Sequence, residues 1–214
     1  MDTSPQTTGP QPVKFSSKMI KLLIAGGVLL ALLAWVAGSY NRLVSSRETV
    51  DTKWSAVESD YQRRSDLVPN LVATVQGAAN FEQDTLTKVT EARAKATSTT
   101  VNLDDPNSVS AFSANQGELS GALSRLLVSV EAYPTLTATQ NFKDLQSQLE
   151  GTENRISVAR KDYSSAAREY NVLRNKFPTN IVASIFSFKE RAYFEAEPGA
   201  EVAPTVDFST PAKE

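Results

Sequence analysis

The chain of 214 residues contains no histidine and no cysteine. Without these residue types, catalysis by a Ser-His-Asp triad or a Cys-His pair is impossible within the chain. Zinc sites built from histidine and cysteine, CxxC redox chemistry and thiolate-bound clusters are excluded for the same reason. Carboxylates could still bind Mg²⁺ or Ca²⁺. Since no disulfide is needed, the lack of cysteine is compatible with either side of a bacterial membrane.

An excess of charge of one sign is also missing. The chain has 22 Lys and Arg against 24 Asp and Glu, a net charge of -2, with 41% hydrophobic and 21% charged residues. These values are ordinary for a globular protein, and they provide no basic field that would hold nucleic acid. There is no glycine-rich phosphate-binding loop. We therefore expect no enzyme, no cofactor, no metal site and no nucleic-acid partner.

What the sequence does contain is one long apolar run near its N-terminus. No charged residue interrupts residues 22–38. At ~1.5 Å per residue the run spans roughly 25 Å, the short end of the range for a transmembrane helix. Aromatic residues at its far end suit the membrane interface. We expect a single-pass anchor in the lipid bilayer over residues 19–39, with bilayer contacts that include Leu22, Leu29, Leu33, Trp35 and Tyr40.

Two alternatives to a permanent anchor stay open. A buried core helix is one, although the run is apolar on every side; a cleavable signal peptide is the other, with Val36-Ala37-Gly38 as a weak cleavage site. The positive-inside rule does not decide the orientation, because three basic residues precede the run and three follow it closely. Lysines directly before a first apolar segment favour a cytoplasmic N-terminus, with the following domain outside the cytoplasm.

From Leu43 onward, apolar residues recur at helical spacing. One row repeats every seven residues through Leu43, Val50 and Val57, and a later row alternates steps of three and four from Phe142 to Phe177. No strand pattern competes. The fold class is therefore all-α, a transmembrane helix followed by an up-and-down four-helix bundle over residues 40–178. The bundle helices are expected over residues 40–65, 67–97, 108–133 and 135–176.

Proline sets these predicted helix boundaries. Because proline is at home in the first turn of a helix and costly in the interior, we expect Pro69 and Pro134 to begin new helices and Pro178 to end the last one. Asp66 is placed to cap the helix that carries Pro69. The alternative is one continuous, kinked helix through Pro69. The polar stretch over residues 98–110 is the one clear loop.

The ends of the chain have a different composition. Residues 1–18 and 197–214 are rich in proline and small polar residues and are expected to be disordered tails. Between the bundle and the second tail, residues 179–196 form a short amphipathic segment. This segment could cap the bundle, lie on the membrane interface or bind a partner.

Several polar residues interrupt the apolar rows and are the candidate site. Arg64 falls at a core position, where it could pair with a carboxylate at a bundle end or form an anion or partner site. Asn171 could fix helix register as a buried polar residue. Charged residues beside the rows, namely Arg93, Glu131, Arg155 and Arg160, are expected to form interhelical pairs. The full candidate cluster is Gln62, Arg63, Arg64, Asp66, Pro69, Asn70, Arg155 and Asn171.

Taken in order, these segments resemble the LemA family. The matching stretches lie within residues 40–194 and include Gln62-Arg63-Arg64-x-Asp66-Leu67-Val68-Pro69-Asn70-Leu71-Val72, Glu131-x-Tyr133-Pro134 and Tyr170-Asn171. The resemblance implies a single-pass protein of the bacterial cytoplasmic membrane with a four-helix bundle and no established enzymatic activity. It also implies a loose link to envelope maintenance and, in one branch, to the building of membrane organelles.

Besides a hydrolase that uses a carboxylate-bound metal ion, which we consider third, two functional hypotheses follow. The first is a membrane-anchored interaction or scaffold module of the bacterial envelope, either homo-oligomeric or bound to other envelope proteins. The second is a ligand or ion sensor that uses Arg63, Arg64 and Asp66 as a polar pocket at the end of the bundle.

Overall fold

The computed structural model describes residues 16–77 and 81–194. Within these ranges the chain forms helices and no strand, so the predicted all-α class is confirmed. The chain divides into two compact units, Met1–Arg42 and Leu43–Glu214. The predicted C-terminal tail, residues 197–214, lies outside the described residues, as does most of the predicted N-terminal tail; Ser17 and Lys18 already belong to the first helix.

The first unit contains the beginning of helix α1, Ser17–Gln76. Side chains of the apolar run are exposed here: Leu22 is 75% exposed, Leu29 58% and Leu33 57%. Among the described residues, α1 is the one helix long and apolar enough to cross a membrane, and none of its most apolar window is buried. Because a core helix would be covered by protein, that alternative is wrong. The helix and its composition indicate membrane association.

Helix α1 continues through Pro69 to Gln76, so the predicted start of a new helix at Pro69 is wrong. Asp66 is accordingly no N-cap; its Oδ1 accepts a hydrogen bond from Gln62 Nε2 at 2.8 Å. Pro69 is exposed, and lacking an N–H it leaves the carbonyl of Ser65 without its intrahelical donor. Arg93 Nε on the next helix donates to that carbonyl at 2.8 Å. This contact explains how the helix tolerates an interior proline.

Two of the remaining helices begin at a side-chain cap. Helix α2 is Gln83–Ser98, and helix α3, Pro106–Val130, is capped by Asp105, whose side chain accepts from Asn107 N. Pro134 begins only the short α4, Pro134–Thr137; the long helix α5, Gln140–Asn175, starts later behind Thr139. The predicted start of the last long helix at residue 135 is therefore wrong. Helix α5 ends three residues before Pro178, and α6, Thr179–Ile185, follows it.

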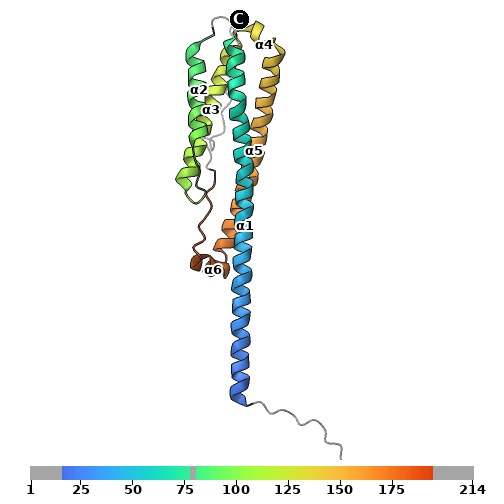
Figure 1. Cartoon of the computed structure of the whole chain (residues 1–214), viewed down its shortest axis with the longest axis vertical. Helices are drawn as coiled ribbons and strands as arrows, with labels where there is room; N and C mark the ends of the chain where they lie inside the picture. Colours follow the sequence, from blue (N-terminus) through green and yellow to red (C-terminus); the bar gives the residue numbers. More distant parts are fainter. Residues whose placement is uncertain (1–15, 78–80, 195–214) are drawn as a thin grey trace, which may run out of the picture. The chain divides into compact units, whose positions relative to one another are not determined.

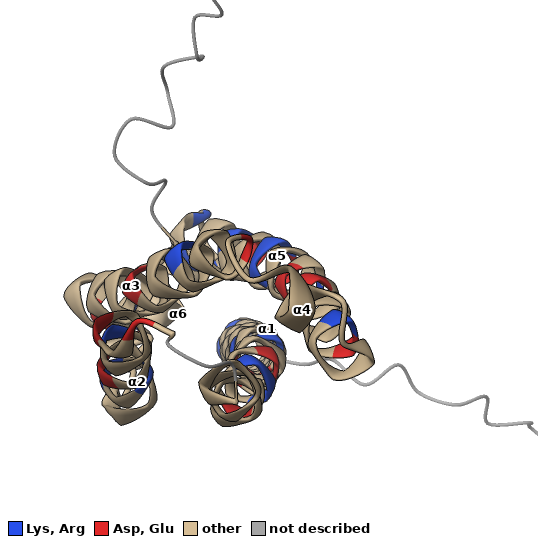
Figure 2. Cartoon of the chain, turned by 90° about the horizontal axis from the view of Figure 1, so that it is seen from above, with Lys and Arg blue, Asp and Glu red and all other residues tan. Residues whose placement is uncertain are grey.

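Buried apolar residues of α1, α2, α3 and α5 pack together in the second unit. Figure 2, which looks along the helices, shows α2, α3 and α5 arranged around α1. One end of the core is aliphatic and includes Val68, Leu71, Val89, Leu119 and Leu149. Towards the other end it is aromatic: the Trp54 ring lies 5.3 Å from that of Phe112 and 5.0 Å from that of Tyr163. Burial of these apolar faces supplies the main driving force for the packing.

Candidate functional site

Arg64 is a fully buried cation, 1% exposed, in the interior of the second unit. Its Nη1 donates to Glu153 Oε1 on α5 at 2.5 Å and to Ser120 Oγ on α3 at 2.7 Å. Its Nη2 donates to Gln116 Oε1 at 2.7 Å and to the Gln116 carbonyl at 3.2 Å. Gln116 Nε2 in turn donates to the Ala96 carbonyl of α2. One guanidinium thus connects α1 to all three helices that surround it.

The position of Arg64 corrects part of the prediction. A carboxylate partner was expected and is present, but the site is not at a bundle end: buried residues lie on both sides of Arg64 along α1, from Tyr61 to Val68. Glu153 takes only one guanidinium nitrogen, so the pair is not bidentate. The guanidinium also lies over the Tyr61 ring at 5.0 Å, and Nε has no partner among the described residues. Arg64 therefore acts as an internal crosslink.

The other members of the predicted cluster do not converge on Arg64. Four neighbours on α1, namely Gln62, Arg63, Asp66 and Asn70, are exposed, as is Pro69. Arg155 is exposed on α5 and forms no ion pair within the described ranges, so the predicted interhelical pair is wrong there. A polar pocket formed by Arg63, Arg64 and Asp66 together is not present, because Arg64 points inward while the other two point outward.

A depression of about 370 Å³ does lie near this network, between α1, α2 and α3. Its lining is mostly hydroxyl and amide groups, and Glu58 is the one charged side chain among the lining residues. Gln62 is the member of the predicted cluster that reaches it. With no cation at its surface, this depression does not favour an anion sensor.

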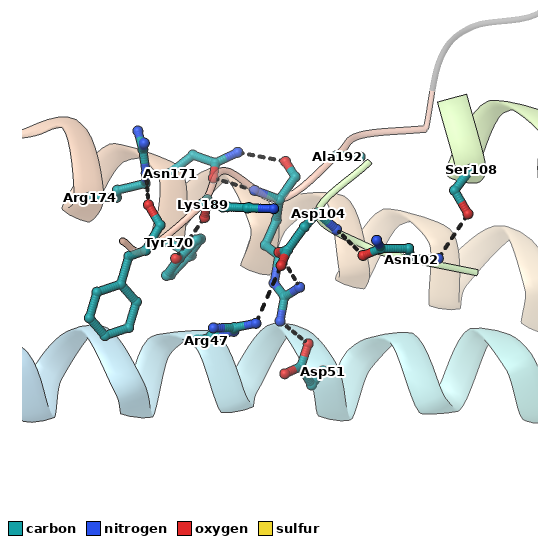
Figure 3. A network of polar contacts seen from close by, with 12 residues as sticks. Arg47, Asp51, Asn102, Asp104, Ser108, Tyr170, Asn171, Arg174, Lys189 and Ala192 are labelled. Atoms are coloured by element: carbon teal, nitrogen blue, oxygen red, sulfur yellow. Dashed lines mark hydrogen bonds and ion pairs between the residues drawn. The ribbon is translucent and has the colours of Figure 1, made fainter. Parts of the chain in front are cut away.

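A second buried arginine, Arg191, holds the C-terminal segment against the helices. Arg191 is 5% exposed; its Nη2 donates to Asp51 Oδ1 on α1 at 2.6 Å, and its Nη1 donates to Asp104 Oδ1 at 2.7 Å. Arg47 approaches the other oxygen of Asp104 at 3.5 Å. Figure 3 shows Arg47 and Asp51 on α1 facing the loop that carries Asp104. This network joins residues 140 positions apart in the sequence.

Side chains of α5 bind the backbone of the same segment, as Figure 3 shows for Tyr170, Asn171 and Arg174. Asn171 makes two bonds: its Nδ2 donates to the Arg191 carbonyl at 2.8 Å, and its Oδ1 accepts from Arg191 N at 2.9 Å. Tyr163 and Tyr170 donate to the carbonyls of Ala192 and Lys189. Asn171 is thus buried, as predicted, but it binds the C-terminal segment instead of another long helix. Residues 188–192 thus pack along α5 and reach Asp51 of α1.

Burial changes the acidity of the groups around Arg191. It raises the pKa of Tyr163 from 10.0 to about 12. It also raises the pKa of Asp51, although Arg191 and Arg47 pull in the opposite direction. Both shifts have the same physical cause, since removal from water disfavours the charged form of each group. The tyrosine hydroxyl therefore remains a donor to the Ala192 carbonyl well above neutral pH.

The LemA family model matches residues 53–208, well over half of the chain. The chain belongs to the LemA family. The match confirms the resemblance found over residues 40–194, although it begins and ends later in the chain. Both buried arginines, Glu153 and Asn171 lie inside the LemA match, whereas the apolar run and Asp51 precede it.

Individual relatives fall into two groups. Magnetosome protein MamQ 2 of Paramagnetospirillum magneticum is 28% identical over 192 residues, which cover 81% of this chain and 71% of the relative. Magnetosome protein MamQ of Magnetospirillum gryphiswaldense is 26% identical over 220 residues, which cover 94% of this chain and 79% of the relative. Protein LemA of Metamycoplasma hominis is 25% identical over 159 residues, covering 74% and 70% respectively. The LemA-type similarity therefore extends over most of this chain.

Arg191 and its partners were missed by the reasoning from sequence. A weak signal existed on α5, where Tyr163, Tyr170 and Arg174 follow one another at steps of seven and four and so share one helix face. That face was attributed entirely to packing between long helices. No local pattern connects Asp51 or Asp104 with Arg191, because their contact depends on how the C-terminal segment crosses the helices.

Proposed function

We propose that this LemA-family chain is a non-enzymatic, membrane-anchored interaction or scaffold protein of the bacterial envelope. The apolar part of α1 would hold it in the cytoplasmic membrane. The second unit would form an up-and-down four-helix bundle outside the cytoplasm, where it associates with further copies or with other envelope proteins. The observation that carries this proposal is the apolar run of α1, which is exposed along its length and has no protein cover within the first unit.

The pairing of buried charged side chains inside the protein supports the same proposal. Arg64, one of the cations predicted as possible binding groups, is paired with internal partners. Others of these cations are spread over the exposed surface. Buried arginines paired in this way specify one arrangement of helices. The names of the relatives refer to the magnetosome or to the family, and none of them refers to a reaction.

Membrane fractionation tests the anchor. Leu29→Arg combined with Leu33→Arg places two charges in the run, each costing about 2.5–3.5 kcal/mol at the centre of a bilayer. We expect this double variant to be released from membranes by alkaline carbonate. The matched control is Val128→Arg, because Val128 lies outside the run and is similarly exposed, at 66%. This control variant should stay in the membrane fraction. Equal release of both variants would contradict the anchor.

The interaction role needs its own test. The chain has no cysteine, so a single introduced cysteine on the exposed surface gives site-specific crosslinks without background. We expect Arg155→Cys, on the exposed side of α5, to crosslink in intact membranes to a second copy or to another envelope protein. A protein that stays monomeric in detergent and yields no crosslink from any exposed helix face would contradict the interaction role. Protease protection in spheroplasts tests the proposed orientation.

A further inference from the structure

Helix α6 carries an exposed apolar surface that the packing of the second unit does not explain. Four large side chains, 48% to 74% exposed, form what we call the α6 outer face: Phe177, Ile181, Ile185 and Phe186. Ile181 and Ile185 are spaced by four residues and so lie along one side of the helix, and Phe177 precedes its first turn. On the other side, Val182 and Ala183 are buried at 1% and 2% exposure. The helix is therefore apolar on both its buried and its exposed side.

The α6 outer face is held in place by defined contacts. Phe188 N donates to the Ala183 carbonyl at 2.9 Å, which closes the turn after the helix. Arg174 Nε, on the last turn of α5, donates to the Phe188 carbonyl at 2.7 Å. Asn180 N, near the start of α6, donates to the carbonyl of Lys176, the residue after α5, at 3.0 Å. Because the turn after α6 is bonded to α5 and only three residues separate the two helices, the outer face has a fixed orientation on the second unit.

The α6 outer face lies at the end of the second unit where that unit's chain begins. Helices α1 and α5 run antiparallel, since Lys53 pairs with Asp162 and Arg64 pairs with Glu153. Continued at the same rise per residue, this register places Leu43 level with the last turn of α5. Helix α6 follows directly, and Figure 1 shows it at the opposite end of the helices from α4.

The covalent connection limits how far the start of the second unit can lie from the apolar run. Only residues 39–42 separate Gly38 from Leu43, and even a fully extended chain of that length spans at most about 18 Å. The charges around α6 suit a membrane surface. Between Glu169 and Glu190 the chain has three cations, Arg174, Lys176 and Lys189, and no acidic residue. Cationic side chains beside apolar ones favour anionic lipid headgroups.

We propose that the α6 outer face is a second membrane contact, which docks on the surface of an anionic bilayer. Its apolar side chains enter the boundary between headgroups and acyl chains, while Lys176 and Lys189 contact lipid phosphates. The occupant is lipid, because the connection to the apolar run keeps this face within reach of the bilayer in any orientation of the two units. The proposal rests on the anchoring role proposed for α1.

Site-specific quenching in vesicles tests this contact. The full chain carrying Ile185→Cys is labelled with a fluorophore and reconstituted into vesicles of phosphatidylglycerol and phosphatidylcholine. A nitroxide-labelled lipid reports contact with the bilayer, and acrylamide reports contact with water. Val128→Cys and Val158→Cys, at exposed valines on α3 and α5, are the matched controls. Ile181→Cys provides a second position on the same face, and far-UV circular dichroism checks that each variant is folded.

We expect the α6 label to be quenched by the lipid and protected from acrylamide, and both control labels to behave in the opposite way. Replacing Lys176 and Lys189 by glutamine should weaken docking about fivefold per lysine. Acrylamide quenching equal to the controls, in vesicles that still float with bound protein, would overturn the α6 contact and leave the anchor standing. Protection from acrylamide without quenching by lipid would mean that protein covers the face, which also overturns it. Failure to float would overturn both proposals.

Discussion

Replacing Arg93 by alanine tests how α1 tolerates a proline in its interior. Pro69 has no N–H, so the carbonyl of Ser65, four residues earlier, receives no intrahelical hydrogen bond. Ser65 is 1% exposed, and water cannot take the place of the missing donor. Arg93 Nε donates to this carbonyl at 2.8 Å. We therefore expect the contribution of Arg93 to the free energy of unfolding to depend on the presence of Pro69.

The size of the effect follows from these contacts. A hydrogen bond from a charged donor contributes about 1.5–3 kcal/mol, and an orphaned buried carbonyl costs about 1–3 kcal/mol. We expect Arg93→Ala to lower the free energy of unfolding by about 2 kcal/mol. In a Pro69→Ala background the amide of residue 69 satisfies Ser65, so the same substitution should cost under about 1 kcal/mol. The coupling energy between the two positions is then about 1–2 kcal/mol.

The measurement is urea unfolding of the full chain in detergent, followed by the fluorescence of Trp54 in a Trp35→Phe background. Trp54 is 5% exposed in the aromatic part of the core, so its emission reports the second unit. Arg155→Ala, at an exposed arginine on α5, is the control and should change stability by less than about 0.5 kcal/mol. An equal cost of Arg93→Ala in both backgrounds would refute the reasoning.

Three further predictions concern the buried networks. Glu153→Gln leaves the buried charge of Arg64 without its carboxylate and should lower the free energy of unfolding by about 2–3 kcal/mol in the same assay. Arg64→Met, which removes that charge and keeps the volume, should cost less. A larger cost of Arg64→Met would contradict a buried cation that depends on its partner. Burial raises the pKa of Tyr163 from 10.0 to about 12. The contribution of the neutral Tyr163 hydroxyl to stability is therefore complete below pH 10 and is lost as pH rises through 12. Tyr163→Phe should remove the last step of a tyrosinate absorbance titration, and an unchanged titration would contradict this assignment. Asn171→Ala removes both bonds to the Arg191 backbone. The loss should cost about 2–4 kcal/mol and speed tryptic cleavage at Arg191, whereas unchanged cleavage would show that the segment is held otherwise.

Periodicity in the sequence was a reliable guide to the core wherever a helix is long. Leu43, Val50 and Val57 belong to one predicted row, and all are 0% exposed. The row on α5 fails only at its end: Phe177 continues the spacing but is 74% exposed. The reason is that α5 ends at Asn175, and beyond a helix end the spacing no longer predicts which way a side chain faces.

Proline was a poor guide because its effect depends on distant partners. The rule that proline begins a helix considers only the local chain. At Pro69 the cost of the missing N–H is offset by Arg93, which belongs to another helix. Arg93 donates to the carbonyl of Ser65, 28 positions earlier in the sequence. Near Pro134, Thr139 provides a stronger cap a few residues later, and the long helix begins there. Neither outcome could be derived from residues adjacent to the proline.

The two buried arginines have a common structural logic, which bears on what the protein can do. Each connects elements that are remote in sequence, and each keeps one buried Nε without a partner among the described residues. A buried ion pair adds little net stability, but any other arrangement leaves its charges uncompensated. A shift of α5 by one turn would separate Glu153 from Arg64, and release of the C-terminal segment would take Arg191 away from the partly buried carboxylates of Asp51 and Asp104. The arginines therefore exclude alternative packings more than they stabilise this one. A protein whose proposed role is contact at a membrane requires surfaces of constant shape. Arg64 and Glu153 fix the helix register, and the bond from Arg174 to the Phe188 carbonyl holds the α6 outer face in position on that frame.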